Sequence, residues 1–284
     1  MQRPRIGITT GDPKGVGPEI VAEALADPEI VKLAEFEVFG PTVFNPKISD
    51  QMAAETALDS LTRATDAALS GNIQAIVTAP VNKKRLRLVD KKFTGHTEFF
   101  AEKTASKVCM MFVAKNWRIS LVTRHLPLAE VPIRLNAMDI LQTIRLTHQG
   151  LQKHFRILEP RLAVAGLNPH AGEGGMLGEE EIRIIAPAIA QARREGIMID
   201  GPLSPDTLFW QMTLDKWDGV IAMYHDQGLI PIKTLAFKDT VQISLGLPFL
   251  RVSVDHGTAE DIAGTGEADP HNLKCAIRLA CQLV

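Results

Sequence analysis

The sequence lacks the features by which membrane-spanning, secreted and nucleic-acid-binding proteins are recognised. No apolar run is long enough to cross a bilayer, and residues 1–5 lead into a strand-like segment without the apolar core of a signal peptide. A formal net charge of −2 over 284 residues gives no electrostatic reason to expect nucleic acid or an anionic membrane as a partner. These absences predict a cytoplasmic protein that acts on small molecules.

Cysteine is scarce as well. Cys109, Cys275 and Cys281 are odd in number, lie in apolar surroundings and lack the spacing of metal ligands. They are therefore predicted to be reduced, buried small side chains, as expected of a cytoplasmic protein.

The familiar nucleotide-binding motifs are also missing. The glycine-rich segment 11–19 contains neither the Gly-Lys-Ser/Thr of a Walker A motif nor a Gly-x-Gly-x-x-Gly fingerprint. From its residues alone, this segment is equally compatible with a plain strand-to-helix turn and with a ligand-binding loop. The basic run 83–85 is most simply a solvated surface patch.

Strand-like and helix-like segments alternate along the chain. Strands are predicted at 5–9, 36–39, 74–78, 108–113, 119–123, 161–165 and 219–223. Helices are predicted at 18–26, 52–70, 137–155, 179–195 and 271–283. A further helix is predicted to begin near Thr97, which would be its cap, and residues 201–207 are predicted to form a turn. The alternation predicts an α/β fold with a largely parallel sheet, in one large domain or two smaller ones.

Three histidines follow predicted strands. His125, His170 and His225 each come within a few residues of a strand end, where ligands collect in open α/β sheets. A single histidine in such a place is usually structural, but three imidazoles would leave an open position on a divalent ion, as a catalytic site requires. The spacing alone therefore favours a metal site, although the three residues are far apart in sequence.

Several other residues are suited to an anion. Lys233 and Arg251 would bind a phosphate or carboxylate. His96 and Thr97 begin a helix and could present an imidazole, a hydroxyl and backbone N–H groups to the same anion. From its residues alone, however, the segment favours the simpler interpretation of His96 as a histidine of a capping region.

Together these segments resemble the 4-hydroxythreonine-4-phosphate dehydrogenase family (PdxA) of vitamin B6 synthesis. The similarity runs nearly end to end through 11–19, 93–100, 125–128, 166–175, 206–209, 223–229, 246–249 and 251–259, which include Phe-Thr-Gly-His-Thr-Glu-Phe-Phe, Gly-Leu-Asn-Pro-His-Ala-Gly-Glu-Gly-Gly and Met-Tyr-His-Asp-Gln-Gly-Leu. The resemblance implies NAD-dependent oxidation of the C3 hydroxyl of 4-phosphooxy-L-threonine. The resulting β-keto acid would lose CO₂ to give 3-amino-2-oxopropyl phosphate.

The resemblance also implies roles for individual residues. A divalent metal ion (Zn, Mg or Co) would be held by His125, His170 and His225, in a homodimer whose active site is shared across the interface and whose third histidine, His225, comes from the partner subunit. The substrate would be contacted by His96, Thr97, Lys233, Gln242 and Arg251, with His96 and Asp206 as the catalytic groups near the reacting hydroxyl.

A second similarity concerns the cofactor. The loop from His256 to Gly266 is similar to the adenosine-binding loop of isocitrate and isopropylmalate dehydrogenases, and implies NAD binding by His256, Gly257, Thr258, Ala259, Asp261 and Gly264. The acidic Asp261 would repel a 2′-phosphate and so favours NAD over NADP. This similarity implies their fold: two α/β domains with a cleft between them, not a Rossmann fold. The expected domains are 1–97 with 240–284, which carries the cofactor loop, and 98–239, which carries the metal ligands and the dimer interface.

Two departures from the family leave the substrate open. Gln242 stands where the B6 enzymes carry an asparagine, and the chain is short between Phe39 and Met52. Relatives with this architecture oxidise D-threonate 4-phosphate, D-erythronate 4-phosphate or cis-dihydrodiols. One pocket methylene shifts discrimination by only about 1–3 kcal/mol, so Gln242 does not displace the B6 substrate. Two other functions compete with this one. A metal-dependent phosphatase would leave the 256–266 loop unexplained. A non-catalytic ligand sensor would be favoured by loss of a metal histidine, but all three are present.

Overall fold

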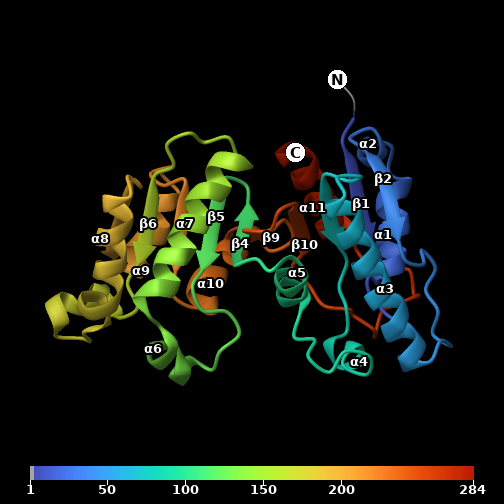
Figure 1. Ribbon diagram of the computed structural model, residues 1–284, viewed down its shortest axis with the longest axis horizontal. Coiled ribbons are helices and arrows are strands. Elements are labelled where there is room, and N and C mark those ends of the chain that lie inside the picture. Colours follow the sequence, from blue (N-terminus) through green and yellow to red (C-terminus); the bar gives the residue numbers. More distant parts are fainter. Residues whose placement is uncertain (1–2) are drawn as a thin grey trace. The chain divides into compact units, whose positions relative to one another are not determined.

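The computed structural model describes residues 3–284, so Met1 and Gln2 of the N-terminal segment lie outside the described residues. The chain divides into two compact units. The first runs up to Val108 and resumes at Lys238–Val284, and the second is Cys109–Phe237. Strands and helices alternate in both units (Figure 1), which confirms the predicted α/β class.

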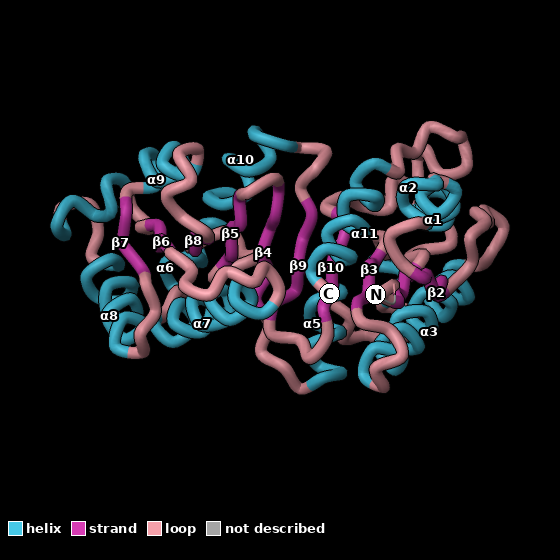
Figure 2. The backbone as a smooth tube through the Cα atoms, turned by 90° about the horizontal axis from the view of Figure 1, so that it is seen from above, coloured by secondary structure: helices cyan, strands magenta, loops and turns pink. Residues whose placement is uncertain are grey.

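The first unit contains a five-stranded array in the order β2-β1-β3-β10-β9. Its strands are β1 (Arg5–Thr9), β2 (Glu35–Phe39), β3 (Ala75–Thr78), β9 (Val241–Leu245) and β10 (Leu250–Val254), and its helices are α1 (Gly17–Ala26), α2 (Pro28–Val31), α3 (Asp50–Leu69), α4 (Lys83–Leu86), α5 (His96–Thr104) and α11 (His271–Leu283). Neighbouring strands are parallel except for the antiparallel pair β9 and β10. Helices α1 and α11 lie on one face, and α3 and α5 on the other (Figure 2).

The second unit repeats this plan with the order β4-β5-β8-β6-β7. Its strands are β4 (Cys109–Ala114), β5 (Trp117–Leu121), β6 (Leu162–Ala165), β7 (Ile199–Leu203) and β8 (Gly219–Ala222), and its helices are α6 (Val131–Arg134), α7 (Ala137–Lys153), α8 (Ala186–Arg194), α9 (Pro205–Met212) and α10 (His225–Ala236), with short 3₁₀ turns at Leu128–Glu130 and Pro169–Gly175 and a π turn at Glu181–Ile185. Only β4 and β5 are antiparallel. Helices α7 and α8 cover one face and α9 and α10 the other (Figure 2).

Apolar burial explains why these segments form strands and helices. The central strands are buried on both faces, so they appear in the sequence as short, uninterrupted apolar runs such as Ala-Ile-Val-Thr in β3 and Gly-Val-Ile-Ala in β8. On one side of the first sheet, Leu61 of α3 and Phe100 of α5 pack with Ile76 of β3. None of the helices within residues 3–284 combines the length and apolar character needed to cross a bilayer.

Several elements were missed in the sequence, among them β7, α9 and α10. Residues 201–207, predicted to be a turn, complete β7 and begin α9. Gly201 and Pro202 concealed the strand. The structure tolerates them because β7 is at the end of the strand order, where the missing N–H of a proline costs no hydrogen bond to a neighbouring strand. The stretch after His225 is a helix, α10, although Pro231 lies inside it and interrupts the helical signal.

Candidate functional site

Arg251 is the most deeply buried charge among the candidate site residues. It lies in β10 with 1% of its surface exposed, and its guanidinium donates to Gln242 and Ser244 of β9 and to Thr78 at the end of β3. These partners are all neutral, and its Nε has no hydrogen-bond partner among the described residues. Burial lowers the pKa of Arg251 to about 9, with the Glu98 carboxylate opposing that shift. The guanidinium can therefore bind an anion.

His96 lies beside this cation at the first residue of α5. Its Nε2 is enclosed and has no hydrogen-bond partner within residues 3–284. Burial, together with the positive charges of Arg251 and Lys83, holds the pKa of His96 well below its usual value. The imidazole is consequently neutral at neutral pH, and one ring nitrogen can accept a proton or a hydrogen bond.

The start of α5 brings the remaining groups of this cluster together. Gly95, not Thr97, is the N-cap, so the predicted capping role of Thr97 is wrong; Thr97 is buried in the first turn instead. A Cβ on Gly95 would approach the Glu98 carboxylate and the Lys83 side chain. The first unit thus gathers two cations, a neutral imidazole and a helix N-terminus together with the Glu98 carboxylate. The cations outnumber that carboxylate, so the arrangement is suited to a phosphate or carboxylate.

The predicted cofactor loop is held by the glycine-rich segment near the N-terminus. The N–H of Val16 donates to the Thr258 carbonyl, and a Cβ on Gly15 would lie 2.8 Å from that same oxygen. At the other end of the loop, the N–H of Gly264 donates to the Glu19 carboxylate at 3.0 Å. The segment 11–19, left open by its sequence, therefore supports the loop of residues 256–266. His256, Gly257 and Asp261 remain exposed.

Arg85 links both segments and was missed in the sequence. Its guanidinium contacts the carboxylates of Asp12, Asp50 and Glu260. Burial would lower the pKa of Arg85, but hydrogen bonds to Glu260 and Asp12 raise it above its ordinary value. The side chain is only 8% exposed, so the prediction that residues 83–85 form a solvated patch is wrong for Arg85. Its spacing from Asp12 and Glu260 gave no signal, because the contacts span 73 and 175 residues.

His170 lies in a left-handed turn of the second unit. Five consecutive residues from His170 to Gly174 have positive φ angles between 44° and 79°, a conformation that costs about 1–2 kcal/mol for each residue with a side chain. Buried Glu181 holds the start of the turn, because its carboxylate accepts hydrogen bonds from the N–H groups of Leu167 and Asn168, each at 2.7 Å. Strained backbone maintained in this way is characteristic of functional sites.

The other two predicted metal histidines lie close together. His125 follows β5 and His225 begins α10, and their ring centroids are 5.5 Å apart. Nδ1 of His225 is 2.7 Å from the Asp226 carboxylate, an interaction that orients the ring and leaves Nε2 available. His170 does not join them within one chain: across residues 3–284, the ligand atoms of the three histidines do not all fall within 4.8 Å of one another. A metal site shared by two subunits stays a prediction.

Two further predicted residues lie in the second unit. Asp206 is exposed in the first turn of α9, where a hydrogen bond from Ser204 lowers its carboxyl pKa and the His170 imidazole contributes to the shift. Lys233 is on α10, with its ammonium 5.5 Å from the centre of the Phe237 ring. The second unit therefore carries the three predicted metal histidines, Asp206 and Lys233. The first unit carries Arg251, His96 and the predicted cofactor loop.

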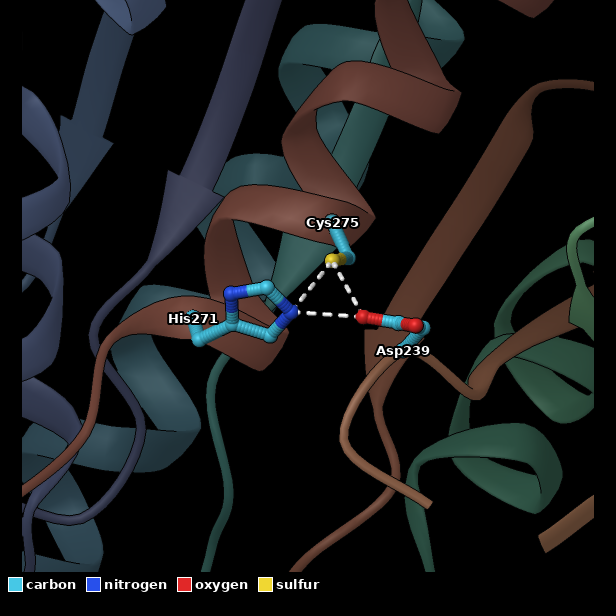
Figure 3. Close-up of side chains that lie close together, drawn as sticks. All are labelled: Asp239, His271 and Cys275. Atoms are coloured by element: carbon cyan, nitrogen blue, oxygen red, sulfur yellow. Dashed lines mark hydrogen bonds and ion pairs between the residues drawn. The ribbon is translucent and has the colours of Figure 1, made fainter. Parts of the chain in front are cut away.

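One cluster of possible ligand atoms was not predicted. Asp239, His271 and Cys275 bring a carboxylate oxygen, an imidazole nitrogen and a thiol within 4.8 Å of one another (Figure 3). The expectation that no cysteine has metal-ligand spacing is wrong for Cys275, which lies one helical turn after His271. Cys109 is buried as predicted, whereas Cys275 and Cys281 are only partly buried.

Known proteins match nearly the whole length of this chain. The family model described as pyridoxal phosphate biosynthetic protein PdxA matches residues 15–280. A 4-hydroxythreonine-4-phosphate dehydrogenase of Desulforapulum autotrophicum is 44% identical over an alignment covering 98% of this chain and 95% of that protein.

Solved structures agree with this match. The 4-hydroxythreonine-4-phosphate dehydrogenase of Klebsiella pneumoniae has a TM-score of 0.89 at 36% identity, with 99% of each chain covered. A terephthalate 1,2-cis-dihydrodiol dehydrogenase of Burkholderia xenovorans is less similar, with a TM-score of 0.70 at 28% identity, covering 99% of this chain and 98% of that one. The chain belongs to the PdxA family of pyridoxal phosphate biosynthetic proteins.

Proposed function

We propose that this protein is a 4-hydroxythreonine-4-phosphate dehydrogenase of pyridoxal phosphate biosynthesis. Its relatives of that name cover nearly the full chain, and the enzyme is accordingly an oxidoreductase. The proposed substrate is 4-phosphooxy-L-threonine, oxidised at C3 by NAD and then decarboxylated to 3-amino-2-oxopropyl phosphate. The observation that carries the proposal is Arg251, a buried cation with neutral hydrogen-bond partners beside His96.

Arg251 supports an anionic substrate on energetic grounds. A buried charge is costly unless it is paired, and the hydrogen bonds to Gln242, Ser244 and Thr78 satisfy its donors only in part. A carboxylate or phosphate oxygen at the unpaired Nε would compensate the charge. We assign Lys233 and Arg251 to the acidic ends of the substrate, with Thr97 and Gln242 as further contacts.

The catalytic roles follow from the protonation states of two side chains. His96 is held neutral by burial and by neighbouring cations, so its imidazole can accept a proton from a substrate hydroxyl or an attached water. The Ser204 hydroxyl stabilises the Asp206 carboxylate as an anion near His170. We propose that Asp206 orients the reacting C3 hydroxyl while His96 receives its proton. NAD, when bound, would accept the hydride from the same carbon.

The histidines fit a divalent cation. The turn containing His170 is held in a strained conformation by Glu181, and Asp226 orients the ring of His225. We propose that His125 and His170 of one chain act with His225 of the partner subunit, so that each metal site contains only imidazoles. An all-imidazole site accepts Zn and Co readily and Mg less well. When bound, the ion would polarise the substrate hydroxyl and favour its deprotonation.

The loop of residues 256–266 fits a dinucleotide. It is exposed and glycine-containing, and it is anchored at both ends by Val16 and Glu19. We assign cofactor binding to His256, Gly257, Thr258, Ala259, Asp261 and Gly264 and propose that the carboxylate of Asp261 selects NAD. This assignment goes with the isocitrate/isopropylmalate dehydrogenase type of fold, in which the domain of residues 1–97 and 240–284 carries the cofactor and that of 98–239 carries the metal ligands.

Exposed apolar side chains support a homodimer formed through the second unit. Fourteen of the twenty large hydrophobic residues exposed within 3–284 lie in Cys109–Phe237, among them Ile133, Met176 and Trp210. Contiguous exposed apolar patches mark association surfaces, and the second unit carries most of the side chains that could form one. We propose that this unit forms the subunit interface of a cytoplasmic enzyme.

The test is NADH formation from 4-phosphooxy-L-threonine, D-threonate 4-phosphate and D-erythronate 4-phosphate, with and without a chelator. We expect chelator-sensitive turnover, fastest with the first substrate. His170→Ala should abolish both turnover and metal binding in the catalytic site, whereas the control His148→Ala on α7 should retain them. Absence of turnover on all three substrates would refute the proposal; a preference for one of the other two would reassign only the substrate, with Gln242 as the first residue to examine.

A further inference from the structure

The cluster of Asp239, His271 and Cys275 lies outside every site described so far. Nε2 of His271 is 2.6 Å from the Asp239 carboxylate and 3.5 Å from the Cys275 thiol, and the thiol is 3.9 Å from the carboxylate (Figure 3). All three residues belong to the first unit. They therefore form one continuous group of oxygen, nitrogen and sulfur donors.

The local structure holds these donors in place. His271 and Cys275 are four residues apart on α11 and so project from the same face of that helix. Asp239 lies in the short turn before β9, and this turn is fastened to α11 by Asn272, whose side-chain amide donates to the carbonyls of Lys238 and Thr240, each at 2.8 Å. The carboxylate thus faces the helix because the backbone on both sides of it is bound there.

The arrangement is unsuited to nucleophilic catalysis. In a Cys-His-Asp triad the thiol and the carboxylate contact different nitrogens of the imidazole. Here both contact Nε2 of His271, so the carboxylate cannot orient the ring while the other nitrogen serves the thiol. Burial and the nearby Asp239 carboxylate also raise the pKa of the Cys275 thiol, contrary to the requirement of a nucleophile.

We propose that Asp239, His271 and Cys275 bind a divalent first-row cation of the zinc type. Zinc takes thiolate, imidazole and carboxylate ligands together, and three protein ligands leave one position for water. A thiolate excludes the hard ions Mg²⁺ and Ca²⁺ as preferred occupants. Nε2 of His271 and the carboxylate oxygen of Asp239 approach the sulfur from α11 and from the turn before β9, as ligands of one ion must.

The distances are close to those of a tetrahedral site. Usual zinc bond lengths of about 2.0–2.3 Å place sulfur about 3.6 Å from either partner, and nitrogen about 3.4 Å from oxygen. The observed sulfur separations of 3.5 Å and 3.9 Å agree with this to within about 0.3 Å. Only the contact between His271 and Asp239 must widen, by about 0.8 Å, and rotation of the Asp239 side chain, which is 46% exposed, supplies that movement.

A bound cation would link the turn before β9 to α11. Asp239 follows the crossing from Phe237 of the second unit to Lys238 of the first by one residue. A cation shared between Asp239 and α11 would add a cross-link at the point where the chain re-enters the first unit. We therefore expect the cation to stabilise the folded first unit, since its ligands come together only on folding.

Cobalt titration of the intact, metal-stripped protein tests the proposal, with a phosphine reductant to keep the thiols reduced. A thiolate bound to Co²⁺ gives a charge-transfer band in the near ultraviolet, which an all-imidazole site cannot give. We expect this band to saturate by two equivalents per chain, when the all-imidazole site is filled as well, and to disappear when two equivalents of Zn²⁺ are added. The readout does not depend on dehydrogenase activity. The cobalt band can therefore be absent while the proposed function holds, and it can be present while the proposed function fails.

Matched variants decide the assignment. Cys275→Ser should abolish the band, and Asp239→Asn should weaken Co²⁺ binding by about tenfold or more. Cys281→Ser, which removes a second thiol from the same helix, should leave both unchanged, and circular dichroism would establish that each variant is folded. Absence of the band in the parent protein, or its persistence in Cys275→Ser, would overturn the proposal.

Discussion

Replacing Arg85 with methionine is expected to destabilise the protein and to loosen the predicted cofactor loop. Methionine keeps the unbranched stem, so the change removes the charge and its hydrogen bonds with little loss of packing. Three carboxylates lose their shared cation, and Asp12 is affected most because its side chain is only 3% exposed. The carboxylates of Asp50 and Glu260 reach water and can be solvated.

The buried pair of Arg85 and Asp12 sets the size of the effect. Breaking such a pair by removing one partner costs about 3–5 kcal/mol, because the other charge is left buried without compensation. The exposed partners add little, since solvent-exposed ion pairs contribute about 0–1 kcal/mol each. We therefore expect the free energy of unfolding to fall by about 3–5 kcal/mol. Adding Asp12→Asn should restore part of it by removing the stranded charge.

Urea unfolding followed by far-ultraviolet circular dichroism measures this difference. Tryptophan fluorescence is the wrong probe, because Trp117, Trp210 and Trp217 all lie in the second unit. Lys84→Met is the matched control: it removes an exposed cation from the neighbouring position of α4 and should change stability by less than about 0.5 kcal/mol. The reasoning is refuted when the Arg85 and Lys84 variants unfold at the same urea concentration. The KM for NAD should also rise in the Arg85 variant, because Glu260 is released.

Three further outcomes follow from the site residues, and a fourth from the substrate pocket. His96 has a pKa below that of the unfolded chain, so acidification below about pH 6.5 should cost up to about 1.4 kcal/mol per pH unit in urea unfolding until the folded imidazole is protonated; His96→Gln should remove this part of the acid sensitivity. Glu181→Gln should release the turn that contains His170 and reduce activity and metal content together; stability lost with the metal content unchanged would argue against a positioning role. Lys233→Ala should raise the KM for the phosphorylated substrate far more than the KM for NAD, and an equal rise in both would contradict its assignment. Gln242→Asn should change relative turnover among the three phosphorylated acids by at most about 200-fold, with no change for NAD.

Local patterns were sufficient for most of the secondary structure. The run at residues 5–9 became β1, and α11 spans His271–Leu283 as predicted, because short apolar runs and helical periodicity are recorded within a few neighbouring residues. Prediction was wrong where tertiary context overrides local preference. The strand β7 tolerates Gly201 and Pro202 because no further strand pairs beyond it, and α10 continues through Pro231.

Residue chemistry was enough to indicate an anion site, and motif order was enough to identify the family. Arg251 and His96 stood out by type, and the comparisons bear out the family assignment. The sequence did not reveal that Arg251 would be almost fully buried or that His96 would lack a partner for its ring nitrogen within residues 3–284. Burial depends on which strands and helices pack around a residue, and that information is spread over the whole chain.

The sequence by itself determined the α/β class, most helices and strands, and the kinds of side chain available for chemistry. The tertiary structure alone decided which distant residues meet. Arg85 looked like surface charge and became the centre of three carboxylates, and Cys275 looked like a small apolar residue and came to lie beside His271 and Asp239. The physical reason is that bringing together residues far apart in sequence costs conformational entropy, which the burial of many other side chains offsets. Because those side chains are spread over the whole chain, no local pattern records the contact.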